Sequence, residues 1–299
     1  MRPLILALNP SIDAEWRVAR TRWEEKNPVL SERRWPGGKG VNVARWLRFL
    51  GGQPRLLLPL GGRTGVELRQ ELRRQKLDLR VIPLREPTRV NVIVTPAIGR
   101  QLRFNPPGPK LTAAEWGRIF QTVATRLPET SVLILSGSLP REAPANVYSR
   151  LIRQAHRANV RTLLDCDGAP LAAAVKDRPF LVKPNESELA QWLGKELRSA
   201  ASVRRAALAL SRATGGWVLV SRGAKGALLV NAAGRFEKAM RTPPVRPVNT
   251  VGAGDALLAA VAGQIEQGAS PEEWLRCGVA AGAAAVQCAA GQLREPTRK

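Results

Sequence analysis

The sequence has very little histidine and cysteine. Its 299 residues include a single histidine, His156, and three cysteines, Cys166, Cys277 and Cys288. One histidine in a basic helical segment argues against a histidine-based triad or a zinc site. The cysteines are odd in number and lack a metal-ligand spacing, so we expect reduced, largely buried thiols in a cytoplasmic protein. Chemistry here must therefore use carboxylates, lysine, arginine and backbone groups.

Long apolar runs are also absent. No segment approaches the ~18 apolar residues of a membrane-spanning helix. Residues 1–10 lack the longer apolar stretch and the cleavage site of an export signal. We therefore expect no membrane association. Hydrophobic residues still make up 44% of the chain, which is enough for a sizeable core.

Acidic residues are scarce relative to basic ones. Lys and Arg number 47 against 24 Asp and Glu, which gives a formal charge of 47 − 24 = +23. Such a charge indicates an anionic partner: nucleic acid, a phosphate-bearing small molecule or an anionic membrane surface. The basic residues form no tail or block, and only ten of them are Lys. Without a localised footprint, nucleic-acid binding is not expected as the main role.

Buried strands and helices alternate along the chain. Short apolar runs predict strands over Pro3–Leu8, Arg55–Leu60, Val132–Ser136, Arg161–Leu164, Phe180–Lys183, Trp217–Ser221 and Ala227–Val230. Helical periodicity covers Val41–Leu50, Val66–Gln75, Ala113–Arg126, Ala145–Ala158, Glu186–Leu193 and Ala200–Ala213. This alternation predicts an α/β fold with a parallel sheet between helices.

Two segments depart from this alternation. Residues 14–36 and 88–105 contain polar and apolar residues at strand period, which predicts strands exposed on one face. We expect them to form a small second sheet beside the main one, within one domain spanning 1–299. Such a sheet is a candidate lid over a cleft.

The strongest chemical signal is the segment Asn249–Ala256, which opens a helix rich in small residues. Gly252, Ala253 and Gly254 leave backbone N–H groups free at a helix N-terminus, where an anion is favoured. Asp255 follows directly and could accept a proton from a hydroxyl that attacks a phosphoryl group. The alternative is an ordinary glycine turn with an aspartate near the helix start.

A second glycine turn, Pro36–Val43, also precedes a helix. Gly37 and Gly38 allow a close backbone approach, Lys39 supplies a cation, and Asn42 offers an amide in the first turn. The turn lacks the spacing of a P-loop and of a dinucleotide fingerprint. A purely structural strand-to-helix turn is the alternative.

Two further polar segments follow predicted strands. Asn9–Asp13 places a carboxylate at the carboxyl edge of the sheet, where open α/β proteins bind ligands, and Ser136–Pro140 lies at the same edge. Asp13 could bind sugar hydroxyls, or it could be a turn aspartate.

The segment Lys183–Glu188 has two interpretations. Asn185 and Glu188 have the spacing of a helix cap and its acidic partner, which needs no further function. They could instead contribute to a magnesium–water site, since Mg²⁺ prefers carboxylates and retained waters. The glycine turn Ser221–Gly226 is either a hairpin or a nucleotide contact.

The order of these motifs resembles a known family. The chain carries, in sequence, Asn9–Asp13, Gly37–Asn42, Thr88–Asn91, Ser136–Pro140, Lys183–Glu188, Ser221–Gly226 and Thr250–Asp255. Together they resemble the ribokinase-like sugar kinases, in the phosphofructokinase B branch. The similarity is greatest to the 1-phosphofructokinases, tagatose-6-phosphate kinases and minor 6-phosphofructokinases.

The resemblance implies ATP-dependent phosphorylation of a sugar phosphate, with Mg²⁺, on a Rossmann-like three-layer α/β/α sandwich with a mostly parallel sheet and a small β-sheet lid. Asp255 matches the catalytic base, and Gly252, Ala253 and Gly254 match the anion hole. The substrate side would comprise Asp13, Gly37, Gly38, Lys39, Asn42, Arg89, Arg103 and Ser136, with Lys39 and Arg89 on the substrate's own phosphate. The nucleotide side would comprise Lys183, Asn185, Ser221, Gly223, Gly226, Thr250, Gly252 and Gly254, with Glu188 meeting magnesium through water.

Several alternatives stay open. Lys39 resembles the fructose-1-phosphate and tagatose-6-phosphate kinases, whereas residues 101–104 and 274–281 resemble the minor 6-phosphofructokinase more. A ribokinase or nucleoside kinase would use a neutral sugar, for which Lys39 and Arg89 serve no evident purpose. A nucleic-acid binder or an inactive regulator on a kinase fold is a different class, and the intact Gly252–Asp255 motif argues against lost activity. The resemblance also allows a homodimer through the lid.

Overall fold

The fold is built on a large, mostly parallel β-sheet. The structure is a computed structural model, and it describes residues 1–293. The nine strands lie in the order β13-β12-β11-β10-β9-β8-β1-β4-β5. Their bounds are β1 Arg2–Leu6, β4 Arg55–Leu60, β5 Asp78–Pro83, β8 Thr130–Ser136, β9 Arg161–Asp165, β10 Leu181–Val182, β11 Trp217–Ser221, β12 Ala227–Asn231 and β13 Phe236–Met240. All neighbours pair in parallel except at the β11–β12 and β12–β13 pairs.

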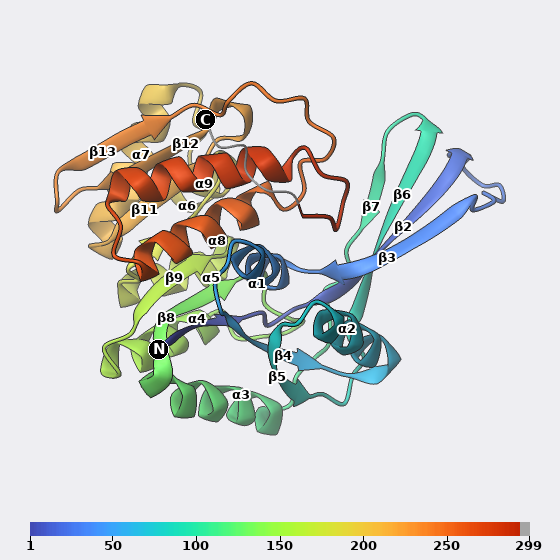
Figure 1. Ribbon diagram of the computed structural model, residues 1–299, viewed down its shortest axis with the longest axis horizontal. Coiled ribbons are helices and arrows are strands. Elements are labelled where there is room, and N and C mark those ends of the chain that lie inside the picture. Colours follow the sequence, from blue (N-terminus) through green and yellow to red (C-terminus); the bar gives the residue numbers. More distant parts are fainter. Residues whose placement is uncertain (294–299) are drawn as a thin grey trace.

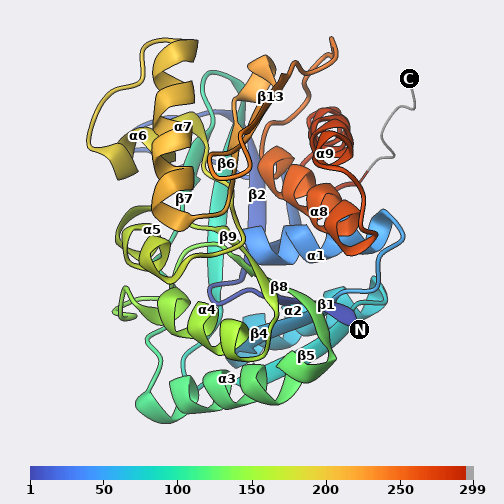
Figure 2. The ribbon, with the colours of Figure 1, turned by 90° about the vertical axis from the view of Figure 1, so that its left-hand side faces the viewer.

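Helices cover both faces of this sheet (Figure 2). One face packs against α1 Lys39–Phe49, α2 Gly62–Arg74, α8 Ala253–Glu266 and α9 Pro271–Ala285. The other packs against α3 Ala113–Arg126, α4 Val147–Arg157, α5 Gly168–Ala174, α6 Glu186–Leu193 and α7 Ala200–Thr214. Since side chains of a strand alternate between faces, each central strand feeds two separate cores. The expected three-layer α/β/α arrangement is confirmed.

Local sequence signals set several helix starts. The Thr112 side chain accepts a hydrogen bond from the Glu115 backbone N–H, and the Thr112 backbone N–H donates to the Glu115 carboxylate, which makes a capping box at α3. Ser270 and Glu273 form the same pair at α9. Each pair satisfies backbone donors that a helix N-terminus otherwise leaves unpaired, and the start of α3 agrees with the predicted helix over 113–126.

A separate four-stranded sheet stands away from the main body (Figure 1). It has the order β3-β2-β6-β7, with β2 Ser11–Arg20, β3 Ser31–Gly37, β6 Arg89–Ile98 and β7 Leu102–Phe104. Strands β2 and β6 run parallel, with Ser11 opposite Arg89 and Asp13 opposite Asn91. This register brings two segments that are far apart in sequence to one edge of the main sheet.

The structure also contains elements that the sequence patterns do not indicate. Strands β5 and β13 and helix α5 are additional, and β10 is shorter than the predicted strand 180–183. Both additional strands lie at edges of the sheet, where one side lacks a neighbour and alternation is weak. The Ser221–Gly226 turn joins the antiparallel strands β11 and β12 and is therefore a hairpin. Within residues 1–293, no helix is long and apolar enough to cross a membrane.

Candidate active site

The motif segments meet in one cleft at the carboxyl end of the parallel strands. The cleft has a volume of about 500 Å³ and lies between the main sheet and the small sheet. Its lining includes Asp13, Gly38, Lys39, Asn42, Arg89, Arg103, Ser136, Lys183, Asn185, Glu188, Ser221, Gly252, Gly254 and Asp255. The crossover of the chain at β1 opens this edge, as in other open α/β sheets.

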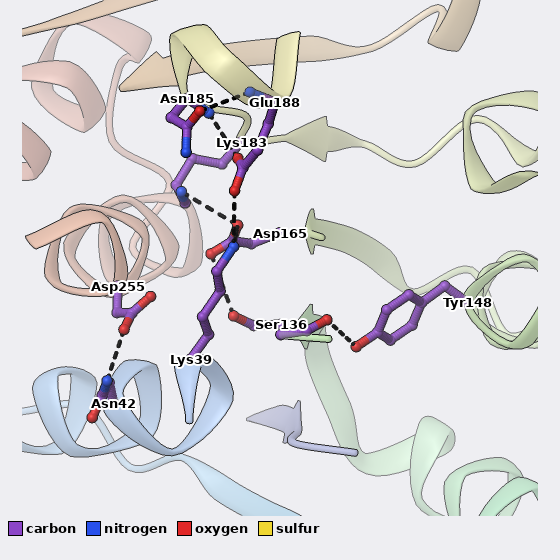
Figure 3. A network of polar contacts seen from close by, with 10 residues as sticks. Lys39, Asn42, Ser136, Tyr148, Asp165, Lys183, Asn185, Glu188 and Asp255 are labelled. Carbon is purple, nitrogen blue, oxygen red and sulfur yellow. Dashed lines mark hydrogen bonds and ion pairs between the residues drawn. The ribbon is translucent and has the colours of Figure 1, made fainter. Parts of the chain in front are cut away.

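Asp255 lies in the first turn of α8 and is almost fully buried. The Asn42 Nδ2 atom donates a hydrogen bond of 2.8 Å to its Oδ2 atom (Figure 3). Burial raises the pKa of Asp255 to about 6, and the negative charge of Asp165 adds to the rise. The hydrogen bond from Asn42 and the nearby ammonium groups oppose it. A carboxylate with such a pKa is suited to accept a proton near neutral pH.

The backbone before Asp255 is shaped for an anion. Gly252 precedes α8 with φ +82°, a conformation that glycine adopts without strain. A side chain at Gly254 would approach the Lys183 ammonium, with a Cβ only 3.3 Å from Nζ. The α8 N-terminus and the Lys183 charge therefore converge on the same space, which favours a negatively charged group there.

Asp13 anchors the opposite side of the cleft. Its Oδ1 atom accepts hydrogen bonds of 2.8 Å from both Ser11 Oγ and Asn91 Nδ2. Burial raises the pKa of this carboxyl despite those bonds. A side chain at Gly37 would overlap Asp13, so the glycine makes room for the carboxylate. This leaves Asp13 as a fixed acceptor for ligand hydroxyls.

Two arginines stand near Asp13 on the small sheet. The Arg89 guanidinium donates to the carbonyl oxygens of Pro106 at 2.8 Å and Asn9 at 3.0 Å, while its buried Nε has no partner. Arg103, on β7, is exposed and bonds to the Gln101 amide oxygen at 2.9 Å. The hydrogen-bond acceptors of Arg89 are thus neutral. Burial lowers the pKa of Arg89, and the charge of the Asp13 carboxylate opposes that effect.

Lys39 starts at the N-terminus of α1 and reaches across the cleft (Figure 3). Its Nζ atom lies 3.1 Å from Glu188 Oε1 and 3.2 Å from Asp165 Oδ1. Burial lowers the pKa of Lys39, but the charges of Asp165 and Glu188 outweigh that effect and raise it overall. The side chain therefore points to the side of the cleft opposite the one that we expect to hold the sugar phosphate.

Asp165, at the end of β9, joins the two lysines of the cleft. It is fully buried, and its Oδ1 atom lies 3.4 Å from Lys183 Nζ as well as near Lys39. Burial raises the pKa of this carboxyl, but Lys183 and Lys39 together bring it below the ordinary value. Ser136 Oγ lies 3.5 Å from its other oxygen. Asp165 is thus an ionised carboxylate between two cations.

Glu188 has two separate contacts. Its Oε2 atom accepts from the Asn185 backbone N–H at 2.8 Å, and Asn185 Oδ1 accepts from the Glu188 backbone N–H at 2.8 Å. Helix capping therefore occurs as the spacing predicts. The other oxygen, Oε1, faces Lys39 in the cleft, so capping does not use up the carboxylate.

A second pocket of about 480 Å³ adjoins the cleft and shares Ser221 and Gly254 with it. Gly223, Gly226, Thr250 and Ala253 also line it. Its other walls are a proline-rich segment over 242–247 and the apolar side chains Leu257, Val279 and Val286. An apolar slot beside an anion-binding turn has the shape that a nucleotide base and its phosphates require.

The sequence reasoning missed some of the residues in this region. The sequence patterns indicate no role for Asp165 or for Asn91, which donates a hydrogen bond to Asp13. The proline-rich wall of the second pocket was also overlooked. An acidic residue directly after a buried strand, as Asp165 is after Arg161–Leu164, was the available signal for the first.

The chain is similar to known kinases over nearly its whole length. Residues 9–298 match the model of the pfkB family of carbohydrate kinases. The ATP-dependent 6-phosphofructokinase isozyme 2 of Escherichia coli is 34% identical over 289 residues, which cover 96% of this chain and 93% of that enzyme. The 1-phosphofructokinase of Haemophilus influenzae is 31% identical over 281 residues, with 94% and 90% covered.

Solved structures show the same similarity. The tetrameric inhibited form of phosphofructokinase-2 from Escherichia coli superimposes with a TM-score of 0.90 at 34% identity, covering 96% of this chain and 94% of that one. The complex of that enzyme with fructose-6-phosphate gives a TM-score of 0.88 at 33% identity, with 96% and 94% covered. The resemblance drawn from the motifs is confirmed, and the chain belongs to the pfkB family of carbohydrate kinases.

Proposed function

We propose that the protein transfers the γ-phosphate of ATP to a hydroxyl of a phosphorylated ketohexose. Fructose 1-phosphate or fructose 6-phosphate would give fructose 1,6-bisphosphate, and tagatose 6-phosphate is the alternative substrate. The observation that carries this proposal is the buried Asp255 at the start of α8, in a cleft with cations on two sides. The small sheet acts as a lid. The cysteines within residues 1–293 form no disulfide bond, which fits a cytoplasmic enzyme.

The substrate's own phosphate would be bound by Arg89, with Arg103 and Lys39 as further cations. Arg89 lies on the small sheet and lines the same cleft as Asp255. Asp13 and Asn42 would bind sugar hydroxyls. A neutral sugar such as ribose would leave the half-buried Arg89 guanidinium with only the Asp13 carboxylate as an anion nearby, which favours the phosphorylated substrate.

Asp255 would accept the proton of the attacking hydroxyl as oxygen approaches the γ-phosphate in line. The backbone N–H groups at Gly252–Gly254 would stabilise charge on the transferring phosphoryl group, together with Lys183. Since phosphoryl transfer depends mostly on positioning and charge neutralisation, these fixed donors would supply much of the rate.

Magnesium fits the donor set if it arrives with the nucleotide. Glu188 and Asp165 already hold a cation, the Lys39 ammonium, between them. Within residues 1–293, no cluster of three or more His, Cys, Asp or Glu could hold a metal alone. The ion would therefore be held by ATP phosphates, by water and by Glu188, and it would supply charge neutralisation.

An ADP-release assay with MgATP tests this function. Fructose 1-phosphate, fructose 6-phosphate, tagatose 6-phosphate and ribose would be compared as acceptors. We expect turnover with a phosphorylated ketose and a fall in kcat of roughly 10²–10⁴-fold in Asp255→Asn, with little change in substrate binding.

The matched control is Asp177→Asn, which alters a carboxylate paired with Arg153 just before β10, at the opposite end of the strands. It should keep normal turnover. Near-normal kcat in Asp255→Asn would refute the assignment of Asp255 as the base. Turnover with ribose but with none of the three sugar phosphates would refute the proposal that the substrate is phosphorylated.

A further inference from the structure

Four charged side chains at the cleft are linked to one another by ion pairs. Lys39 and Lys183 are the cations, and Asp165 and Glu188 are the anions. Lys183 is 4% exposed and Asp165 fully buried, so their pairing is a fixed part of the core. Lys39 is 33% exposed, so it is the member of the set that can leave.

The backbone and the charge of Lys39 belong to different halves of the cleft. The residue follows Gly38, which packs against Pro10 of the segment that carries Asp13. Its ammonium lies instead beside Glu188, whose helix α6 starts next to the nucleotide-side residues Asn185 and Lys183 (Figure 3). One side chain therefore spans from the sugar half to the nucleotide half.

The same ammonium cannot neutralise these carboxylates and a sugar phosphate at once. Two of its three N–H donors meet carboxylate oxygens at 3.1 Å and 3.2 Å, so its single positive charge already faces two negative ones. Partly buried charges are poorly screened, so Lys39 leaves only if another cation takes its place beside Glu188. The cation that accompanies a nucleotide triphosphate is the one that the proposed reaction provides.

We propose that Lys39 couples the two halves of the cleft, being held by Asp165 and Glu188 until a magnesium nucleotide replaces its charge there and frees it for the sugar phosphate. This inference rests on the proposed function. Because coupling between sites is reciprocal, each ligand must then tighten the binding of the other by the same factor.

Calorimetric binding tests this coupling without turnover. The Kd of fructose 6-phosphate, and separately of fructose 1-phosphate, would be measured alone and with saturating Mg²⁺ and a non-hydrolysable ATP analogue. We expect the analogue to lower the Kd of the sugar phosphate at least 5-fold in the wild-type chain, within the usual range of coupling. In Lys39→Met the analogue should lower the Kd of the sugar phosphate by less than 2-fold.

Glu188→Gln provides a second, opposite test. Removing this charge loosens Lys39, so the sugar phosphate should bind at least 2-fold tighter than in wild type when no nucleotide is present. Its amide can still accept the hydrogen bond from the Asn185 backbone N–H, so the cap of α6 is kept. A variant that only damaged the fold would weaken binding instead.

Lys110→Met is the matched control, since Lys110 pairs with Glu142 on an exposed surface. It should keep the wild-type coupling factor. An unchanged factor in Lys39→Met, or no tightening in Glu188→Gln, would overturn the inference while turnover in the ADP-release assay would leave the proposed function standing. Absence of both turnover and sugar-phosphate binding in wild type would overturn both.

Discussion

At the scale of single residues, the ionised form of Asp255 that the proposed reaction requires lowers the stability of the fold. Its pKa is raised from 3.8 to about 6 in the folded chain, mainly by burial. A raised pKa means that folding favours the protonated form. Below about pH 3.8 the carboxyl is protonated in both states, so it does not lower the free energy of unfolding. As the pH rises the ionised form lowers that free energy, and the full loss is reached above about pH 6. The carboxylate that we propose as the general base must bear this cost in order to be ionised at neutral pH.

Asp255→Asn should therefore be more stable than wild type at pH 8, by roughly 2–3 kcal/mol, since one pKa unit corresponds to about 1.4 kcal/mol. The advantage should narrow as the pH falls towards 4. Asparagine keeps an oxygen that can accept the Asn42 hydrogen bond, so the substitution removes only the charge. Urea unfolding at pH 8, 6 and 5 measures the difference in the free energy of unfolding between the two proteins. An equal or lower stability at pH 8 would contradict the burial of an ionised base.

At the scale of elements, the position of α1 depends on a close contact at its second residue. A Cβ at Gly40 would lie 2.8 Å from Ala7 Cβ and 3.0 Å from the Ser136 carbonyl oxygen. Both neighbours belong to segments that continue buried strands, so they cannot move aside cheaply. Helix α1 carries Lys39 and Asn42, so a change in its distance from the sheet would move both side chains in the cleft.

Gly40→Ala should therefore destabilise the fold by about 1–3 kcal/mol and lower kcat, because the start of α1 must shift. Gly117→Ala is the control. Gly117 is exposed within α3 and a Cβ there meets nothing within 4 Å. Alanine at this position should therefore raise the free energy of unfolding by about 0.5–1 kcal/mol. Thermal unfolding and steady-state kinetics of both variants measure the contrast. Wild-type stability in Gly40→Ala would show that the helix has room to move.

The elements also show how far sequence reasoning reaches. The starts of α3 and α6 agree with the predicted helices, because the capping boxes at these starts are local sequence signals. The Gly252–Asp255 turn could likewise be read from its own residues. The direction of the Lys39 side chain could not be predicted in this way, because it depends on the position of Asp165. Asp165 lies between Ser136 and Lys183, which follows from the order β8-β9-β10 in the sheet. Strand order is a long-range property that a single sequence does not display.

At the scale of the whole molecule, the small sheet exposes apolar side chains away from the main body. Ile98 is 82% exposed and Phe104 55%, and Trp16 on the adjacent strand β2 is 37% exposed. Among residues 1–293, no further strand pairs with β3 or β7, so these two strands are the edges of the small sheet. A lid with an apolar surface and unpaired edges is the kind of surface that a second copy of the chain covers.

We therefore expect the chain to form a homodimer through the small sheet at micromolar concentration. Ile98→Asp should shift the sedimentation coefficient to that of a monomer of 32.5 kDa. Leu50→Asp, at the end of α1 on the main body, should leave the dimer intact because it lies outside the small sheet. Since the small sheet also carries Arg89, the monomer should bind the sugar phosphate more weakly. A wild-type monomer, or a dimer that survives Ile98→Asp, would place the contact elsewhere.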